Sequence, residues 1–199
     1  MVEEASKGNM VVRLKGGDPF IFGRGGEEVM ALAKARVLFE VIPGITAGLG
    51  AASGFGIPLT HRDDATSTLF ITGHQCRRTA KQDWEILAKL NSTLVFYMGT
   101  RRITDIVLGL IKNGKSKDTP IAIAQNATMI NQHIITSTLG SILEELIDNQ
   151  TMTPSIIIIG NVVKYHAKLQ EWLDILPAEI VEPIGDLGFD IWKHKVVVA

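Results

Sequence analysis

The chain has 199 residues, which is enough to bury a substantial core in one or two domains. Its 20 basic and 21 acidic residues leave a formal net charge of −1 at pH 7, so no basic field favours binding to nucleic acid or to a membrane surface. Hydrophobic residues make up 46% of the chain, a share typical of α/β proteins with buried strands, and no apolar run is long enough to predict a transmembrane helix.

The start of the chain and its cysteine count indicate the compartment. Residues 1–10 are polar and acidic, unlike a signal peptide, and the single cysteine, Cys76, excludes an intrachain disulfide. We therefore expect a soluble, cytoplasmic protein.

The first part of the chain is predicted to alternate between helices and strands. Residues 1–10 resemble the end of a helix. Alternating apolar residues predict strands over residues 11–15 and 37–42. Helical patterns cover residues 27–35 and, with small side chains, residues 45–52. A domain that opens on the end of a helix leads us to expect that a preceding segment is missing.

A glycine-rich turn ends the first of these strands. Gly16 and Gly17 let the backbone come within contact distance of a ligand, and Pro19 cannot continue a strand ladder. A second glycine cluster follows, and acidic residues then open a helix, where they face the positive end of its dipole. A strand that ends in such a turn before a helix is where α/β sheets bind ligands.

The second part of the chain alternates regularly and predicts a mixed α/β sheet. Several chain breakers fall within residues 54–62, so we place a domain boundary there. The predicted domains are residues 1–63, residues 64–169, and an extension, 170–199, to which the sequence assigns no function. The predicted strands are 67–72, 93–98, 120–125, 132–138 and 155–159, and the predicted helices are 83–90, 103–112 and 141–147.

Residues 13–28, RLKGGDPFIFGRGGEE, closely resemble the corresponding block of the uroporphyrinogen-III C-methyltransferases, which belong to the tetrapyrrole methylase superfamily. The resemblance covers roughly residues 1–169 and includes the LTHRD sequence that begins at Leu59. It implies two α/β domains with an S-adenosylmethionine cleft between them. The family's glycine-rich first strand and its acid and base residues are not found in this sequence. The resemblance therefore implies an incomplete first domain and assigns no catalytic residue.

The resemblance assigns cofactor binding to glycines with open backbone, to polar groups and to an apolar wall for a flat base. Alternatives remain open at three positions. Asp18 could serve only to form the turn, Thr46 could serve as a helix cap, and Met98 could be a core residue. Ala127 stands where the family often has glycine, and two alternatives remain open: its methyl group either presses slightly on the cofactor or narrows that part of the pocket. The assigned positions are Gly16, Gly17, Asp18, Ile21, Thr46, Ala47, Met98 and Ala127.

The substrate implied by the resemblance is uroporphyrinogen III, a macrocycle bearing eight carboxylates. Cations are needed to recognise it, and arginine is the best suited because its fork matches a carboxylate. The histidines show no metal-ligand spacing, and we predict no metal site. The candidate substrate-binding residues are Arg13, Lys15, Arg24, His61 and Arg62.

The expected function is S-adenosylmethionine-dependent C-methylation of uroporphyrinogen III to precorrin-2, in sirohaem or cobalamin synthesis. The family also implies a homodimer. Two alternatives remain: a later corrin-ring methyltransferase, or a catalytically inactive module that binds cofactor or tetrapyrrole or only dimerises. Since no acid or base is assigned, we expect residues 1–199 alone to hold the cofactor weakly and to turn over little substrate.

Overall fold

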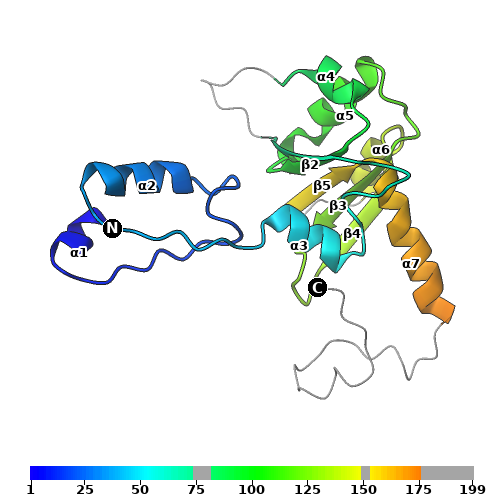
Figure 1. Ribbon diagram of the computed structural model, residues 1–199. Helices are drawn as coiled ribbons and strands as arrows, with labels where there is room; N and C mark the ends of the chain where they lie inside the picture. Colours follow the sequence, from blue (N-terminus) through cyan, green and yellow to red (C-terminus); the bar gives the residue numbers. More distant parts are fainter. Residues whose placement is uncertain (74–81, 149–152, 176–199) are drawn as a thin grey trace. The chain divides into compact units, whose positions relative to one another are not determined.

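The computed structural model describes residues 1–73, 82–148 and 153–175 (Figure 1). Cys76 and residues 176–199 of the predicted extension lie outside the described residues. Contacts divide the chain into two units, residues 1–166 and residues 167–199. Of the second unit, the structure describes residues 167–175, which belong to helix α7 (Lys164–Ile175). The boundaries expected near residues 63 and 169 stay predictions.

The described residues of the first unit form one mixed, five-stranded sheet in the order β1-β2-β5-β3-β4. Figure 1 labels β2, β3, β4 and β5. Strand β1 (Thr68–Thr72) runs parallel to β2 (Thr93–Tyr97), and β3 (Pro120–Gln125) runs antiparallel to β4 (His133–Thr138). Strand β5 (Ser155–Ile159) lies between the two pairs and is antiparallel to both neighbours. The predicted mixed sheet is confirmed.

Strands β2 and β5 are apolar on both faces because helices cover both sides of the sheet. Leu94, Phe96 and Ile157 pack on one side against helices α4 (Trp84–Lys89), α5 (Ile103–Lys112) and α6 (Ile142–Asp148). Val95, Tyr97 and Ile158 pack on the other side against helix α3 (Ala47–Gly54). Burial of β-branched and aromatic side chains on both faces explains why TLVFY and SIIII form strands.

Residues 1–46 contain helices but no strand in the structure. The predicted helices appear as α1 (Val2–Ser6) and α2 (Gly25–Lys34). The predicted strands at residues 11–15 and 37–42 are wrong: no described segment hydrogen bonds to either of them as a neighbouring strand. A strand needs such a partner to satisfy its backbone, so both segments are irregular. Their apolar side chains are largely exposed, among them Val12, Leu14 and Leu38 at 73%, 81% and 98%.

None of the helices in the described ranges combines the length and the apolar character that crossing a membrane requires.

Candidate functional site

A cavity of about 720 Å³ opens at the end of the sheet where β3 ends and β5 begins. Its walls come from three parts of the chain that are far apart in sequence. The glycine-rich turn contributes Gly17, helix α3 contributes its small-residue face, and the loop after β3 contributes Ala127. The lining residues include Gly17, Ala47, Gly50, Gly54, Ala127 and Thr128.

Two glycines bring the glycine-rich turn against the start of α3. A side chain at Gly44 would place its Cβ 2.5 Å from the carbonyl oxygen of Gly17, so only glycine allows this approach. Gly17 has a φ of +85°, and its own position lies beside the backbone of residues 45–47. The turn predicted to bind cofactor is therefore one wall of the cavity.

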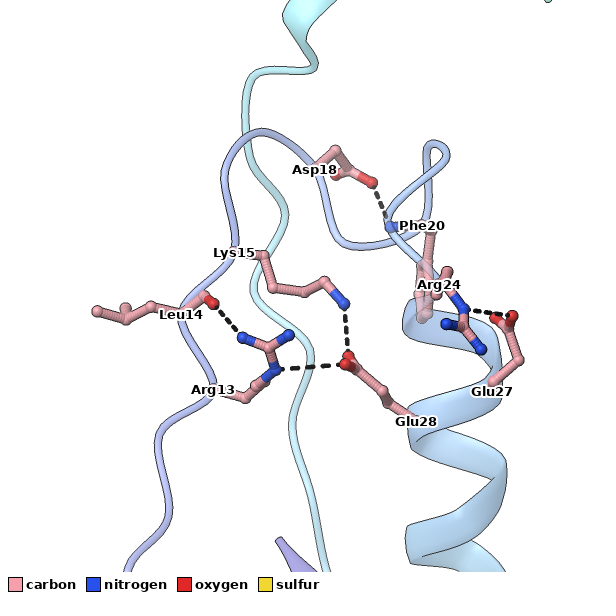
Figure 2. Close-up of polar contacts among 8 residues, drawn as sticks. All are labelled: Arg13, Leu14, Lys15, Asp18, Phe20, Arg24, Glu27 and Glu28. Atoms are coloured by element: carbon pink, nitrogen blue, oxygen red, sulfur yellow. Dashed lines mark hydrogen bonds and ion pairs between the residues drawn. The ribbon is translucent and has the colours of Figure 1, made fainter. Parts of the chain in front are cut away.

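Asp18 joins the same two segments through backbone hydrogen bonds. Its Oδ1 accepts from the backbone N–H groups of Phe20 and Ile21 at 2.8 and 3.2 Å, and its Oδ2 accepts from that of Gly44 at 3.1 Å (Figure 2 draws the bond to Phe20). These bonds, that from Gly44 first, hold the pKa of the carboxyl below its ordinary value. The structure thus supports the turn role of Asp18, and contact with the cofactor stays a prediction.

Left-handed backbone occurs at or beside two of the positions predicted to bind cofactor, Met98 and Ala127. Met98 directly follows β2 with a φ of +55° and is 56% exposed, so it is not a core residue. Ala127 lies between Asn126 and Thr128, which have φ of +47° and +69°. A β-branched residue at positive φ is strained, and such residues concentrate at functional sites. Gln132 supports this loop, because its Oε1 accepts from the backbone N–H of Thr128 at 2.9 Å.

Three of the predicted substrate-binding residues, Arg13, Lys15 and Arg24, pair with glutamates in the structure (Figure 2). The Glu28 carboxylate lies 2.6 Å from Lys15 Nζ and 3.3 Å from Arg13 Nε. Arg24 Nε lies 3.2 Å from Glu27. The hydrogen bond from Lys15 is the main reason why the pKa of Glu28 is lowered. A substrate carboxylate would have to share or replace these partners.

His61 belongs to a separate polar cluster. Its Nδ1 lies 3.1 Å from the Tyr165 hydroxyl, and the two rings are 4.5 Å apart. The buried Asp64 carboxylate accepts from Tyr165 at 2.7 Å and from Lys164 at 2.6 Å. The bond to Asp64 raises the pKa of Tyr165 to about 12. Arg62 is exposed, and among the described residues it has no ion pair.

The structure does not bring this cluster to the 720 Å³ cavity. Asp64 lines a second, smaller cavity of about 120 Å³ together with Ser92 and Gly160. Ser92 precedes β2 and Gly160 follows β5. This smaller cavity therefore lies at the end of β2 and β5 opposite to the 720 Å³ cavity. Substrate binding by His61 and Arg62 remains a prediction.

Within the described parts of the chain, His, Cys, Asp and Glu side chains form no group of three that could hold a metal ion. Sequence reasoning missed Tyr97, whose hydroxyl contacts Thr46 at 2.7 Å. The only available signal was its place immediately before Met98.

The lowered pKa values predict a loss of stability in acid. A carboxyl whose folded pKa lies below its ordinary value, 3.8 for Asp64, stabilises the fold above that value and loses the effect as pH falls through the folded pKa. We expect Asp64→Asn to be less stable than the wild type at neutral pH and the difference to shrink below about pH 4. Urea unfolding across this range measures it.

The exposed Asp118 provides the control for that experiment. Asp118→Asn should unfold like the wild type at every pH. A difference between Asp64→Asn and the wild type that stays constant down to about pH 2.5 would show that ionisation of Asp64 does not stabilise the fold.

The arrangement described above, a glycine-rich turn meeting a small-residue helix at the end of an α/β sheet, is typical of cofactor-binding α/β proteins. Residues 1–143 match the family model described as Tetrapyrrole (Corrin/Porphyrin) Methylases. The chain belongs to the tetrapyrrole methylase family.

Known relatives agree with this family. The chain is 49% identical over 185 residues to a siroheme synthase of Nitrosomonas europaea and 50% identical over 170 residues to siroheme synthase 2 of Aeromonas hydrophila. These matches cover 93% and 85% of the chain but only 38% and 36% of the relatives, so the chain spans little more than a third of their length.

Among solved structures, the chain is similar to the uroporphyrin-III C-methyl transferase of Thermus thermophilus in complex with S-adenyl homocysteine. The TM-score is 0.71 and the identity 33%, over 82% of this chain and 71% of that one. A cobalt precorrin-4 methyltransferase gives a TM-score of 0.73 at 24% identity, over 81% and 68%, and shows the shared fold. The predicted family and fold class are confirmed.

Proposed function

We propose that this chain contributes the cofactor-binding part of an S-adenosylmethionine-dependent C-methyltransferase that converts uroporphyrinogen III to precorrin-2. The product would enter sirohaem or cobalamin synthesis. The observation that carries the proposal is the cavity that joins Gly17, Ala47 and Ala127. The family relationship, the siroheme synthase relatives and the Thermus thermophilus enzyme support the same reaction.

The cavity suits S-adenosylmethionine, which the family uses. Its volume, about 720 Å³, lies within the usual range of about 300–1,000 Å³ for small-ligand pockets. Glycine and alanine on α3 leave flat apolar surface that a planar base can contact closely. When bound, the cofactor would supply an electrophilic methyl group. The task of the chain is then to hold that group in line with a pyrrole carbon, since alignment supplies much of the rate of such displacements.

Substrate recognition is proposed for Arg13, Lys15, Arg24, His61 and Arg62. Arg62 is exposed and forms no ion pair among the described residues. It can therefore bind a substrate carboxylate without first losing an acidic partner. We further propose a cytoplasmic homodimer, for which sedimentation of the purified chain is the test.

Cofactor binding can be tested by introducing a side chain at the cavity wall that fills the cavity. A Cβ at Gly50 would approach no atom closer than 4.0 Å, so Gly50→Ala should fold normally and controls for the loss of the glycine itself. Gly50→Leu adds a side chain at the cavity wall and should block the ligand. Calorimetric titration with S-adenosylhomocysteine measures both variants and the wild type. Failure of the wild type to bind would overturn the proposal, and equal binding by Gly50→Leu would place the ligand elsewhere.

Activity needs a separate experiment. Transfer of a labelled methyl group from S-adenosylmethionine to uroporphyrinogen III would be followed for residues 1–199 alone and for the same chain joined to a family N-terminal segment. We expect turnover in the joined protein and little in residues 1–199. Binding in both without turnover in either would favour the inactive binding module. Turnover of a later corrin intermediate alone would favour a different methylase of the family.

A further inference from the structure

The buried hydroxyl of Tyr97 connects β2 to the beginning of helix α3. Tyr97 is 6% exposed and Thr46 is 4% exposed, so water does not satisfy either group. The Tyr97 oxygen lies 2.7 Å from Thr46 Oγ1 and accepts the backbone N–H of Gly48 at 2.8 Å. The contacting residues are 51 and 49 positions apart in the sequence, so these contacts are tertiary and not local.

The hydrogen bonds define what each group does. Gly48 donates to the Tyr97 oxygen, and the phenol proton then needs an acceptor of its own. Thr46 Oγ1 shares a hydrogen bond with this phenol, in which either hydroxyl can be the donor. Thr46 is the N-cap residue of α3, yet its side chain makes no capping bond. Tyr97 therefore supplies the helix cap that usually comes from the N-cap side chain itself.

The packing around Tyr97 fits this role. A Cβ at Gly48 would lie 2.5 Å from the Tyr97 oxygen, so glycine is required for the contact. The Tyr97 ring centroid lies 4.8 Å from that of Phe22, in the glycine-rich turn, and 5.8 Å from that of Phe70, on β1. One side chain thus touches β1, the turn and the start of α3.

The end of α3 that Tyr97 holds is also the start of a cavity wall. Ala47, Gly50 and Gly54 line the cavity from successive turns of this helix. A shift or rotation of α3 would move all three together. The helix has few large side chains to anchor it, and its first turn depends on the bonds to Tyr97.

We propose that Tyr97 is a positioning residue for the cofactor: its hydroxyl fixes the first turn of α3 and thereby the small-residue wall of the cavity. The inference rests on the proposed function, because it assumes that S-adenosylmethionine occupies this cavity. It assigns no contact between Tyr97 and the ligand.

The test compares Tyr97→Phe with Tyr165→Phe, measuring affinity for S-adenosylhomocysteine by calorimetry and stability by urea unfolding. Both variants lose one hydroxyl, but the Tyr165 hydroxyl bonds to Asp64, whose cavity lies at the other end of the sheet. We expect roughly tenfold weaker binding for Tyr97→Phe, the size expected when a buried donor and acceptor lose their partner, and unchanged binding for Tyr165→Phe. Equal affinities in Tyr97→Phe and the wild type would overturn the proposal.

Variants of Thr46 separate positioning from a general loss of stability. Thr46→Val removes the contact with Tyr97 but keeps the bond from Gly48, so it should weaken binding by less than Tyr97→Phe, and Thr46→Ser should restore part of what Thr46→Val loses. The double variant Tyr97→Phe, Thr46→Val should show no loss beyond that of Tyr97→Phe, because Tyr97→Phe already removes both bonds. Independent, multiplying losses would contradict the inference. No binding by the wild type would instead refute the proposed function itself.

Discussion

Gly44→Ala is expected to abolish measurable binding of S-adenosylhomocysteine. The added methyl group would lie 2.5 Å from the Gly17 carbonyl oxygen, a backbone atom that no side-chain rotation can move away. The glycine-rich turn must then separate from residues 45–47, and the cavity loses the wall that Gly17 provides. Overpacking of this kind costs about 1–3 kcal/mol of folding free energy. Calorimetry and urea unfolding would measure the two effects.

Gly26→Ala is the matched control for that variant. Gly26 lies in helix α2, and a Cβ there would meet nothing within 4 Å. Alanine is a better helix former than glycine, so this variant should be at least as stable as the wild type and bind equally well. Normal binding by Gly44→Ala would show that the turn is free to move without loss of the site.

Leu110→Ala is expected to lower the free energy of unfolding by about 2–5 kcal/mol, because it leaves a cavity in a closely packed core. Leu110 lies on α5, has no exposed surface and belongs to the cluster that packs on one face of the sheet. Such a loss is a large part of the stability of an ordinary domain. Urea unfolding monitored by circular dichroism measures it.

Leu108 lies on the same helix and makes the comparison specific. It is 54% exposed, so Leu108→Ala should change stability by no more than about 0.5 kcal/mol. Similar losses in the two variants would mean that α5 does not pack on the sheet through the face described here.

Much of the structure of residues 64–169 could be predicted because the signals there are local. The apolar runs that became β2 and β5 are bounded by turn residues, and Asn113 and Gly114 end α5 where the pattern indicated. The strands predicted at residues 11–15 and 37–42 failed because an alternating pattern shows that a segment can form a strand, but not that a partner strand is present. Helix α7 (Lys164–Ile175) was not among the predicted helices.

Only the residues of the candidate site that belong to recognisable sequence motifs could be predicted. Gly17, Ala47 and Ala127 were named from the resemblance, and the structure places all three on one cavity. The acidic partner of Lys15 and the tertiary helix cap at Tyr97 were not predicted. Each of these interactions joins two residues that are far apart in the sequence. Their separation follows no helix or strand period, so the sequence carries no periodic signal for them.

The place of β5 in the sheet has a consequence for how the chain acquires its structure. Among the described strands, β5 comes last in sequence but occupies the centre, between β2 and β3. On the ribosome, β1–β2 and β3–β4 emerge first as separate two-stranded pairs with open edges. Only when residues 155–159 emerge can the two pairs join, which makes this a high-contact-order fold with one late closing step. Amide protection in β2 and β3 should therefore appear together, after β5 has inserted between them.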